Sequence, residues 1–523
     1  MRVIDLGALR RPPVEGYCDR RSYLPGEVVL LHCSTELPTF DVEVARMGME
    51  REVVWRAEGV AASWQDTPEN DSTHGCGWMP TLSFDVGDDW RSGCYLVTFG
   101  PAGARGADLG DAMFVVRPRE PTADALLVLS TNTYNAYNAF GGDCLYTGAT
   151  QVSFQRPLLP GYLRRPVDPD GFDGRFAAPV PEGDRDHLGL LDYQARHGLQ
   201  MWISSGGWWN WERRFVRWAE TVRIDLDYAT NADLEFTPEV VDGHRLLVSM
   251  GHDEYWSWAM RDTHEAHVAA GGNAAFFGGN NVLWQVRYED EGDTMVCFKG
   301  DWRRDPVLGT EDEQRLSTCF VHPRVGRPEN TTTGLCFFRG GYVRIGDAVP
   351  HSSGTYTVHR PDHWALAGTG LRYGDQLGAV SRPVGYECDG CAFELVDGLP
   401  VPTGEDATPE SFEIVATTPA RLISISMDGS VDEAPTDFWA SHDPPGDLEG
   451  ASMVLFGDAS PEHTARLAHN HAVLGSFSVP GGGTVFNAGT CDWAYGLDDD
   501  PIVQQVTRNV LAHLGSPSRP APT

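Results

Sequence analysis

A chain of 523 residues is longer than one hydrophobic core accommodates, so its length predicts two to four domains. Its apolar content of 41% is that of a folded protein, and its formal net charge of −34 gives no basic footprint for a nucleic acid. We therefore expect a globular protein with no nucleic-acid partner, whose acidic surface favours a neutral or cationic small-molecule ligand.

Targeting signals and cysteine usage bear on the compartment. The first residues lack an apolar segment followed by small residues, and no long apolar run occurs, so we expect neither a signal peptide nor a membrane span. The 11 cysteines are odd in number and scattered along the chain. This pattern predicts a reduced, cytoplasmic protein rather than a disulfide framework.

Residues 1–118 have the pattern of an all-β unit. Short β-branched and aromatic runs alternate with clusters of Gly, Pro and Asp at intervals typical of a sandwich. These runs are residues 28–33, 40–46, 94–99 and 114–117. We predict an immunoglobulin-like β-sandwich, followed by a linker at residues 118–121.

Beyond the linker, apolar strands alternate with helical segments. The first strand, residues 125–130, is apolar throughout, as expected where both faces of a parallel sheet are covered. Alternation of this kind predicts a doubly wound α/β core of the flavodoxin or class I amidotransferase type over residues 121–290. The other elements predicted there are strands at 199–203, 245–250 and 272–279 and helices at 187–197 and 258–270.

The rest of the chain departs from this alternation and then returns to it. Residues 291–445 are rich in Gly, Pro, Thr and short β runs, which predicts a β-rich insertion or lid. The second part of the α/β core is expected at residues 446–515, and residues 516–523 are predicted to be a disordered tail. In this second part we predict strands at 453–457 and 482–489 and a helix at 501–514.

Polar segments follow three of the predicted core strands, and ligands of open α/β sheets bind beyond the carboxyl ends of the strands. One such segment contains His252, Asp253 and Glu254. In extended backbone His252 and Glu254 point to one side and Asp253 to the other, so we expect the first two to face the pocket. Alternatively, Asp253 or Ser257 caps the following helix.

The segment after the first strand holds three tyrosines, Tyr134, Tyr137 and Tyr146, interleaved with asparagines. Each tyrosine alone would be a packing residue, but a loop this polar is poor core material. Two further positions are open to a structural or a functional interpretation. Asn280 either forms a turn with positive φ or directs its amide into the pocket, and Glu387 either lies in a solvated turn or belongs to the site.

Five segments, in the same order, resemble signature blocks of the N,N-dimethylformamidase large (beta) subunit family. The resemblance covers roughly residues 121–515. The segments are residues 133–146, 251–257, 276–287, 385–390 and 489–497.

The resemblance implies a mononuclear ferric iron held by two tyrosines and one glutamate. Carried over by motif, Tyr146 and Glu254 are ligands, and the second tyrosine is Tyr137, with Tyr134 as the alternative. Two phenolates and one carboxylate would balance three positive charges, and hard oxygen donors suit such an ion.

The implied activity is that of an iron-dependent amidohydrolase, which cleaves a non-peptide C–N bond of a small neutral amide with metal-activated water. The family's polar residues map to His252, Glu387 and Asn280: one of the first two transfers protons, and Asn280 donates to the oxyanion. The resemblance also implies a homo-oligomer and a possible small partner subunit. The short stretch between Tyr137 and Tyr146 departs from the formamidase, as does Asp253, so the substrate itself need not be dimethylformamide.

Three tryptophans, Trp256, Trp284 and Trp493, are candidates for an apolar wall around the substrate, although each is also ordinary core material. Two other functions compete with the metal hydrolase. One is a thiol enzyme that uses Cys144 with His252, although Cys144 lacks the elbow expected of a nucleophile. The other is a non-catalytic carbohydrate- or protein-binding module. Cys388 and Cys391 form a lone pair without the second pair of a structural zinc site.

Overall fold

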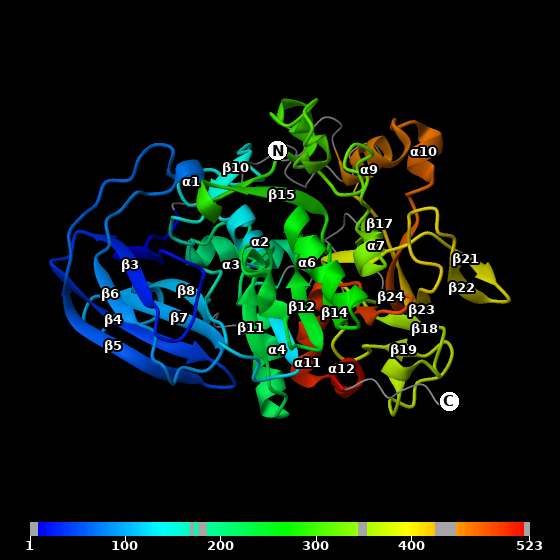
Figure 1. Cartoon of the computed structure of the whole chain (residues 1–523), viewed down its shortest axis with the longest axis horizontal. Coiled ribbons are helices and arrows are strands. Elements are labelled where there is room, and N and C mark those ends of the chain that lie inside the picture. Colours follow the sequence, from blue (N-terminus) through cyan, green and yellow to red (C-terminus); the bar gives the residue numbers. More distant parts are fainter. Residues whose placement is uncertain (1–8, 168–171, 176–185, 344–352, 424–445, 517–523) are drawn as a thin grey trace.

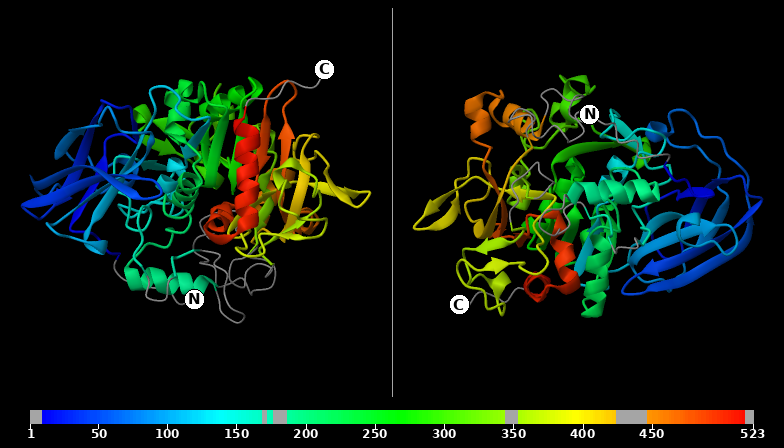
Figure 2. Two further views of the ribbon diagram at one scale, coloured as in Figure 1. Left: turned by 90° about the horizontal axis from the view of Figure 1, so that it is seen from below. Right: turned by 180° about the vertical axis from the view of Figure 1, so that it is seen from behind.

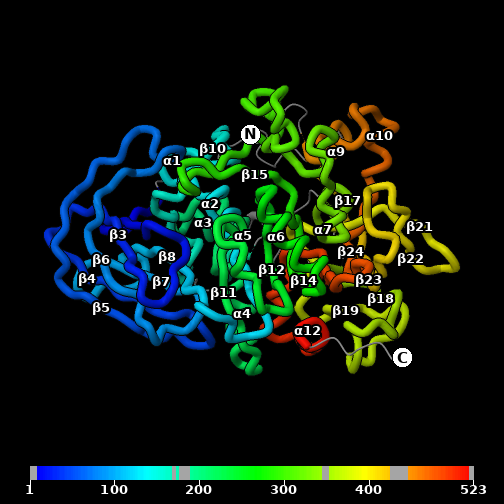
Figure 3. The backbone as a smooth tube through the Cα atoms, viewed as in Figure 1, coloured from blue at the N-terminus to red at the C-terminus, as the bar shows by residue number. Residues whose placement is uncertain are grey.

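A computed structural model describes residues 9–167, 172–175, 186–343, 353–423 and 446–516. It is a mixed α/β protein with an all-β region, in blue, on one side of a central sheet (Figure 1). The tube in Figure 3 follows the chain from this region through the green centre to the yellow and orange strands on the other side. No helix within the described ranges is long and apolar enough to cross a membrane, and the 11 cysteines there are buried and free of disulfides.

The all-β region consists of two sheets that face each other across an apolar cluster. Val29 and Leu31 from one sheet and Val42 and Val44 from the other alternate with more exposed neighbours, so each strand buries one face. The predicted strands of this region are present, while immunoglobulin-like connectivity stays a prediction. The first sheet has the order β1 (Val14–Cys18), β3 (Val28–Thr35), β6 (Leu82–Asp85), and the second β2 (Ser22–Tyr23), β8 (Gly110–Val116), β7 (Gly93–Gly100), β4 (Thr39–Met47), β5 (Arg51–Ala61).

The central sheet has nine strands, of which the first five are parallel and the last four antiparallel. In spatial order they are β11 (Asp227–Thr230), β9 (Ala125–Leu129), β12 (Leu246–His252), β14 (Asn273–Gly279), β25 (Thr484–Asn487), β24 (Asn470–Ser478), β23 (Glu413–Ala420), β18 (Tyr356–Val358) and β19 (Gln376–Leu377). Three of these strands, β18, β19 and β23, come from the predicted insertion at 291–445, which therefore extends the core sheet. A flavodoxin-like core stays a prediction.

The helices cover both faces of the parallel strands. Leu127 and Leu129 of β9 pack into a cluster with α4 and α12, whereas Leu126 and Val128 pack into a second cluster with α5 and α6. Both faces of this strand are therefore dry, which explains its unbroken apolar sequence. Figure 2 shows α12, in red, along the sheet. The principal helices are α2 (Thr131–Tyr137), α3 (Asp186–His197), α4 (Glu212–Thr221), α5 (Asn231–Phe236), α6 (Trp258–Ala269), α9 (Asp447–Phe456), α11 (Gly496–Asp499) and α12 (Pro501–Gly515).

Two predicted strands are wrong. Residues 199–203 form turns, in which Ala139 N–H donates to Gln200 Oε1 and Asn210 Nδ2 donates to Ile203 O. The neighbour of β9 is instead β11. Residues 453–457 form the end of α9 and the cap after it, at Gly457 with φ +87°. A five-residue apolar run fits a buried helix as well as a strand, and here the run forms the end of a helix.

Within the described ranges, three smaller sheets lie outside the central sheet and the all-β region. A four-stranded sheet has the order β10 (Gln151–Ser153), β16 (Thr294–Val296), β15 (Trp284–Glu289), β13 (Tyr255–Ser257). A two-stranded ladder pairs β17 (Cys336–Tyr342) with β20 (Glu387–Gly390), and a hairpin pairs β21 (Phe393–Val396) with β22 (Leu399–Pro402). The β17–β20 ladder is joined to the core by a bridge between Cys388 and Thr490, which brings β20 to the end of the sheet.

Candidate functional site

The predicted site residues meet beyond the carboxyl ends of β9, β12 and β14. Tyr137 ends α2, the helix that follows β9, and His252 ends β12 with Glu254 two residues later. Asn280 follows β14, and Glu387 begins β20. The strand-end rule therefore found this part of the molecule correctly, and the β17–β20 ladder adds a residue from far along the chain.

Three oxygen-bearing side chains form a cluster at this place, which we call the oxygen cluster: Tyr137, Tyr146 and Glu254. The two phenol oxygens lie 2.7 Å apart. Tyr146 Oη lies 2.7 and 2.9 Å from the two oxygens of Glu254, and Tyr137 Oη lies 3.1 Å from Glu254 Oε2. The phenol rings are stacked with centroids 4.2 Å apart.

The structure separates Tyr134 from Tyr137. Tyr134 turns away and donates to Glu212 Oε1 at 2.5 Å, whereas Tyr137 faces Glu254. Among the described residues, the hydrogen bonds given by the Tyr134 hydroxyl join it to Glu212 and not to the oxygen cluster. The geometry therefore favours Tyr137 over Tyr134 as the second tyrosine of the oxygen cluster. Tyr134 is instead a buried residue that joins α2 to Glu212.

The oxygen cluster fits a hard trivalent ion. Burial raises the pKa of both phenols well above the usual value, the neighbouring Glu254 raises them further, and burial also raises the pKa of Glu254. A bound cation would reverse these directions, because it favours the ionised form of each ligand. Oxygens in adjacent positions around one octahedral ion at about 2.0 Å lie about 2.8 Å apart, close to the separations observed here.

Two further side chains hold the residues of the oxygen cluster in place. Trp284 Nε1 donates to Glu254 Oε1 at 2.7 Å, and Tyr255 donates to Tyr146 Oη at 2.8 Å. Trp284 thus contacts the oxygen cluster, and its place in an apolar wall around the substrate stays a prediction. Trp256 and Trp493 do not: the first lies in the core cluster beneath α6, and the second donates to Thr507 of α12.

Lys299 lies over the cluster and was missed by the sequence reasoning. Its Nζ is 3.1 Å from the ring centroid of Tyr146 and has no hydrogen-bond partner within the described part of the chain. Burial lowers the pKa of Lys299 to about 8, although Glu254 acts in the opposite direction. The sequence does contain a signal for this residue. Of its 40 Lys and Arg residues, Lys299 is the only lysine and all the others are arginines.

His252, Glu387 and Asn280 form the other side of the site, which we call the proton-transfer side. His252 Nε2 lies 2.8 Å from Glu387 Oε2 and 3.3 Å from Glu254 Oε2. Asn280 Nδ2 donates to Glu387 Oε2 at 2.9 Å and lies 3.2 Å from His252 Nε2. The other nitrogen of His252, Nδ1, lies 2.8 Å from the carbonyl oxygen of Ser205, which fixes the ring.

Charge governs the protonation of this side. Burial alone would lower the pKa of His252, but the carboxylates of Glu387 and Glu254 raise it to about 9. The site thus pairs one imidazole with two carboxylates at hydrogen-bond distance. Such an arrangement can accept a proton at a carboxylate and deliver one from the ring.

Asp253 and Ser257 have the structural roles that the sequence left open. Asp253 accepts hydrogen bonds from Asn231 at 3.0 Å and from Ser249 at 2.9 Å, on the side away from His252 and Glu254. Ser257 is the N-cap of α6 and accepts from Met260 N–H. The alternation predicted for 252–254 is therefore present, and the cap is Ser257.

Several site residues have backbone conformations that non-glycine residues rarely adopt. Asn280, Val282, Lys299 and Tyr386 have φ of +50°, +60°, +50° and +48°. Val282 is β-branched, for which a positive φ is strongly disfavoured. Strain of this kind collects at functional sites, where the surrounding structure holds it.

A softer set of donors overlaps the proton-transfer side. Ligand atoms of His252, Glu387 and Cys491 lie within 4.8 Å of one another, and all three residues are buried. Cys491 donates to the carbonyl oxygen of Gly279 at 3.2 Å, and burial raises the pKa of its thiol well above the usual value. Cys388 and Cys391 are not part of this set.

The thiol-enzyme alternative gains little from the geometry. Cys144 Sγ accepts from Tyr146 N–H at 3.4 Å and lies 3.8 Å from Thr147 Oγ1, and no hydrogen bond joins it to His252 in the described residues. Burial raises the pKa of Cys144, which keeps the thiol protonated. A nucleophilic cysteine needs the opposite shift.

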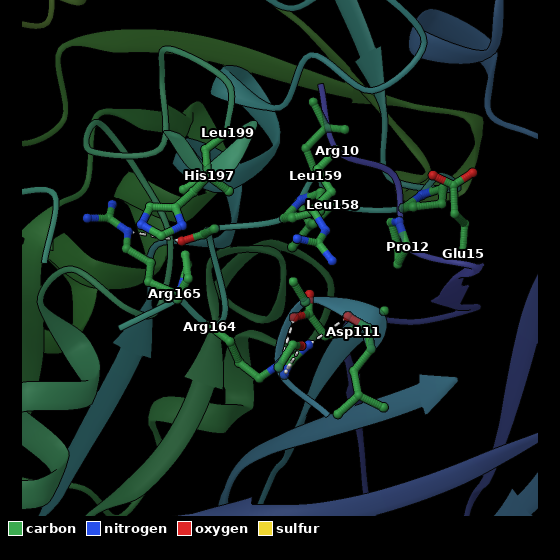
Figure 4. A pocket seen from close by; sticks show the side chains of 18 of the residues that line it. Arg10, Pro12, Glu15, Asp111, Leu158, Leu159, Arg164, Arg165, His197 and Leu199 are labelled. Atoms are coloured by element: carbon green, nitrogen blue, oxygen red, sulfur yellow. Dashed lines mark hydrogen bonds and ion pairs between the residues drawn. The ribbon is translucent and has the colours of Figure 1, made fainter. Parts of the chain in front are cut away.

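A separate hollow of about 240 Å³ lies between the all-β region and the loop that follows β10. Figure 4 shows Arg164 directed toward Asp111 of β8, with Leu158 and Leu159 on the opposite wall. None of the predicted site residues lines this hollow. It is therefore an interface between two parts of the fold and not the candidate active site.

Comparison with known proteins agrees with the resemblance seen in the sequence. The beta subunit of N,N-dimethylformamidase from an Alcaligenes species is 23% identical over 260 residues, 47% of this chain and 32% of that protein. The match thus spans about a third of the relative's length. A family described as "N,N-dimethylformamidase beta subunit-like, C-terminal" matches residues 41–508, which includes most of the all-β region that the sequence blocks left out. Since this match covers far more than half of the chain, the protein belongs to the N,N-dimethylformamidase beta subunit-like family.

Proposed function

We propose that this protein is an iron-dependent amidohydrolase that cleaves a non-peptide C–N bond of a small amide. The observation that carries the proposal is the convergence of Tyr137, Tyr146 and Glu254, whose oxygens lie 2.7 to 3.1 Å apart beside His252 and Glu387. The relative from Alcaligenes is a subunit of an enzyme named for such a reaction, which supports the reaction class.

The oxygen cluster would hold one ferric ion. Its two phenolates and one carboxylate together carry three negative charges, so the loaded cluster is neutral and tolerates burial. An ion held by these three residues would supply Lewis-acid activation of the amide carbonyl and of water. Lys299, 3.1 Å above the ring of Tyr146, stabilises the negative charge of that phenolate.

The proton-transfer side moves the protons of hydrolysis. Glu387 is the carboxylate that accepts the proton of the attacking water. His252 Nε2, 2.8 Å from Glu387 Oε2, passes a proton to the leaving nitrogen. A C–O bond forms and the C–N bond breaks, so the products are a carboxylic acid and an amine.

Asn280 has a different part from the oxyanion donor that the sequence suggested. Its Nδ2 already donates to Glu387 Oε2 at 2.9 Å. We therefore assign Asn280 Nδ2 the task of orienting the Glu387 carboxylate. In this position the amide does not serve as the oxyanion donor.

A second candidate function keeps the hydrolase but moves the metal. The ligand atoms of His252, Glu387 and Cys491 lie within 4.8 Å of one another, and an imidazole with a thiolate suits zinc. The oxygen cluster is preferred because it leaves His252 and Glu387 free for proton transfer. In the second candidate, those two residues would be ligands.

The assembly is also a proposal. The Alcaligenes relative is named a beta subunit, so that protein works with a partner subunit. We propose that this chain forms a homo-oligomer and takes a small partner subunit. Size-exclusion chromatography with light scattering, on the chain expressed alone, tests the first part.

The main test is elemental analysis of the purified full chain with its visible spectrum and its turnover of small amides. We expect close to one iron per chain, a ferric–phenolate charge-transfer band, and hydrolysis that is lost on chelation and restored by iron. A colourless, metal-free protein with full hydrolase activity would refute the proposal. Zinc that disappears in Cys491→Ser would favour the second candidate, and loss of turnover in Cys144→Ala with iron retained would favour the thiol enzyme.

A further inference from the structure

Asp389 is a buried carboxylate beside the site, and the proposed reaction gives it no part. It lies two residues after Glu387 on β20, so the two side chains point to the same face of this strand. Its exposed fraction is 0%. Its oxygens accept three hydrogen bonds from one turn: Asn280 N–H donates to Oδ1 at 2.7 Å, and Asn281 donates to Oδ2 through its N–H at 3.2 Å and through Nδ2 at 2.8 Å. These bonds join β20 to the turn that follows β14.

The conformation of this turn suits a carboxylate. Asn280 has φ of +50°, in the left-handed region, where asparagine is enriched among non-glycine residues. A left-handed residue in a turn directs successive N–H groups toward one anion, and here that anion is Asp389. The carboxylate therefore stabilises a backbone conformation that would otherwise be strained.

A glycine lets β20 approach the turn closely. A Cβ on Gly279 would lie 2.5 Å from the carbonyl oxygen of Glu387 and 2.8 Å from the backbone nitrogen of Cys491, closer than non-bonded atoms pack. The backbone of β20 is also held to the segment after β25, because Asp389 N–H donates to Gly489 O at 3.0 Å. The backbones of Glu387 and Gly279 are thus in contact, and the Asp389 side chain ties the two segments together.

The position of β20 decides where Glu387 meets the other side chains. Glu387 comes from a two-stranded ladder, whereas His252 ends β12 and Asn280 follows β14 of the central sheet. Glu387 Oε2 lies 2.8 Å from His252 Nε2 and 2.9 Å from Asn280 Nδ2. Proton transfer depends on such separations, and a displacement of about 1 Å lowers a rate by up to about 10²-fold. A contact that fixes β20 against β14 therefore bears on the rate.

We propose that Asp389 is a positioning residue, whose carboxylate holds β20 on the Asn280–Asn281 turn and so sets the Glu387 carboxylate against His252. Asp389 acts through Glu387 and does not contact the substrate. The inference rests on the proposed function, because it concerns the carboxylate that accepts the proton of water there. It gives Asp389 a part in the rate and none in iron binding.

The kinetic test is a double-mutant cycle of Asp389→Asn and Glu387→Gln on the iron-loaded full chain. The asparagine keeps the size of the side chain but turns an NH₂ group toward one of the N–H donors. We expect Asp389→Asn alone to lower kcat for a small amide by about 10²-fold, with KM within about threefold of wild type and iron content unchanged. In the Glu387→Gln background the same change should lower kcat by less than about threefold.

Two kinetic results would contradict the inference. One is an unchanged kcat in Asp389→Asn. The other is a full multiplication of the two losses in the double variant, because a residue that only stabilises the fold acts independently of Glu387.

Asp227→Asn is the matched control. Asp227 is also 0% exposed, and it accepts from Thr122 N–H at 2.6 Å and from Ala123 N–H at 3.0 Å. It lies at the start of β11, at the end of the parallel strands opposite the site. We expect Asp227→Asn to lower Tm as Asp389→Asn does, while kcat stays within about threefold of wild type. An equal loss of kcat in the two variants would mean that lost stability explains both, and the inference would fail.

Asn281→Ala covers the case in which Asp389→Asn does not fold. It removes only the Nδ2 hydrogen bond of 2.8 Å to Asp389 and leaves both backbone N–H donors in place. We expect kcat to fall by about threefold to tenfold with iron retained, and no further fall when Glu387→Gln is also present. Equal losses in both backgrounds would again contradict the inference.

Hydrogen exchange separates this inference from the proposed function, because it needs no turnover. The N–H groups of Asn280 and Asn281 donate to Asp389, so Asp389→Asn should speed exchange in peptides that contain residues 276–284 and 385–391, measured by mass spectrometry. Faster exchange there in a chain that hydrolyses no amide supports the hold of Asp389 on β20, in which case only the proposed function has failed. Unchanged exchange in both peptides overturns the inference whatever the turnover.

Discussion

The two sides of the site are built by different parts of the fold. The oxygen cluster comes from short segments at the ends of parallel strands: Tyr137 and Tyr146 after β9, and Glu254 after β12. The proton-transfer side takes Glu387 from β20, which belongs to a separate two-stranded ladder. His252 is the residue that links them, with contacts of 3.3 Å to Glu254 and 2.8 Å to Glu387.

This difference separates metal binding from rate. If the proposed function is correct, residues of the oxygen cluster control whether iron is bound, because they would supply its ligands. Residues of the proton-transfer side should control turnover with iron in place. If the two sides are independent, a substitution on one side changes iron content or turnover but not both.

The largest effect is expected from Tyr146→Phe. The change removes one ligand oxygen and leaves the ring stacked on Tyr137 at 4.2 Å. We expect iron content and the visible band to fall to a small fraction of wild type, and amide turnover to fall by about 10³-fold or more. Elemental analysis and the absorption spectrum of the purified variant measure the two effects together.

Tyr134→Phe is the control for this change. Tyr134 lies on the same helix but donates to Glu212, so its loss should leave iron and the visible band in place. If Tyr134→Phe removed the iron and Tyr137→Phe did not, the assignment of the second tyrosine ligand would be reversed.

Glu387→Gln should give the complementary result. The change keeps the size of the side chain but removes the carboxylate that accepts the proton, so kcat should fall by about 10²- to 10⁴-fold. Iron content and colour should stay near wild type, because Glu387 is outside the oxygen cluster. Loss of iron in this variant would show that Glu387 is a ligand, and the two sides would no longer be distinct.

The sequence predicted the residues of the oxygen cluster better than the residues that contact and position them. His252 ends β12 and Glu254 follows two residues later, and strand-end position is readable from apolar runs and glycines. Tyr146 lies beyond α2, far from the end of β9, and was located by the resemblance. The choice between Tyr134 and Tyr137 needed the structure, because residues one turn apart on a helix share a face. What separates them is Glu212, a partner 78 residues away from Tyr134.

The rest of the site depends on contacts that local patterns do not encode. Lys299 begins a short 3₁₀ segment and has no motif of its own. Cys491 lies in the block 489–497 just beyond the end of β25, but its block did not mark it as a neighbour of His252. The false strand at 453–457 has the same origin, since a short apolar run does not specify its period. The addition of β18, β19 and β23 to the core sheet is a long-range pairing of the same kind.

Lys299→Met should have a smaller effect on rate and a clear effect on colour. Removal of the ammonium 3.1 Å from the Tyr146 ring destabilises the phenolate, so the charge-transfer band should move to longer wavelength. We expect iron to be retained and kcat to fall by about tenfold. An unshifted band would show that Lys299 does not act on the phenolate. The Lys299 side chain would then only pack against the Tyr146 ring.

Because Lys299 is the only lysine, the native chain offers a second route to the same question. Amine-selective acetylation can modify only this side chain and the chain terminus. A protein acetylated at Lys299 should show the same red shift as Lys299→Met. Protection of Lys299 in the iron-loaded protein, and its modification after iron removal, would place the amine against the metal side of the site.

The last prediction concerns a buried carboxyl outside the oxygen cluster, that of Glu329. Burial raises the pKa of Glu329 to about 8, and neither of its oxygens has a hydrogen-bond partner in the described structure. In the unfolded chain this carboxyl loses its proton near pH 4.5, whereas the folded protein holds it to about pH 8. Stability from this group is therefore complete below pH 4.5 and falls as pH rises to 8, by up to about 1.4 kcal/mol per pH unit.

Glu329→Gln removes this loss, because glutamine does not titrate. We expect the Tm of the variant to exceed that of wild type at pH 8 and to approach it at pH 5, measured by scanning fluorimetry. Glu58→Gln, at an exposed carboxyl, should leave both values unchanged. Equal pH dependence of Glu329→Gln and wild type would mean that Glu329 is ionised in the folded protein, with the positive charge of Arg261 sufficient to offset its burial.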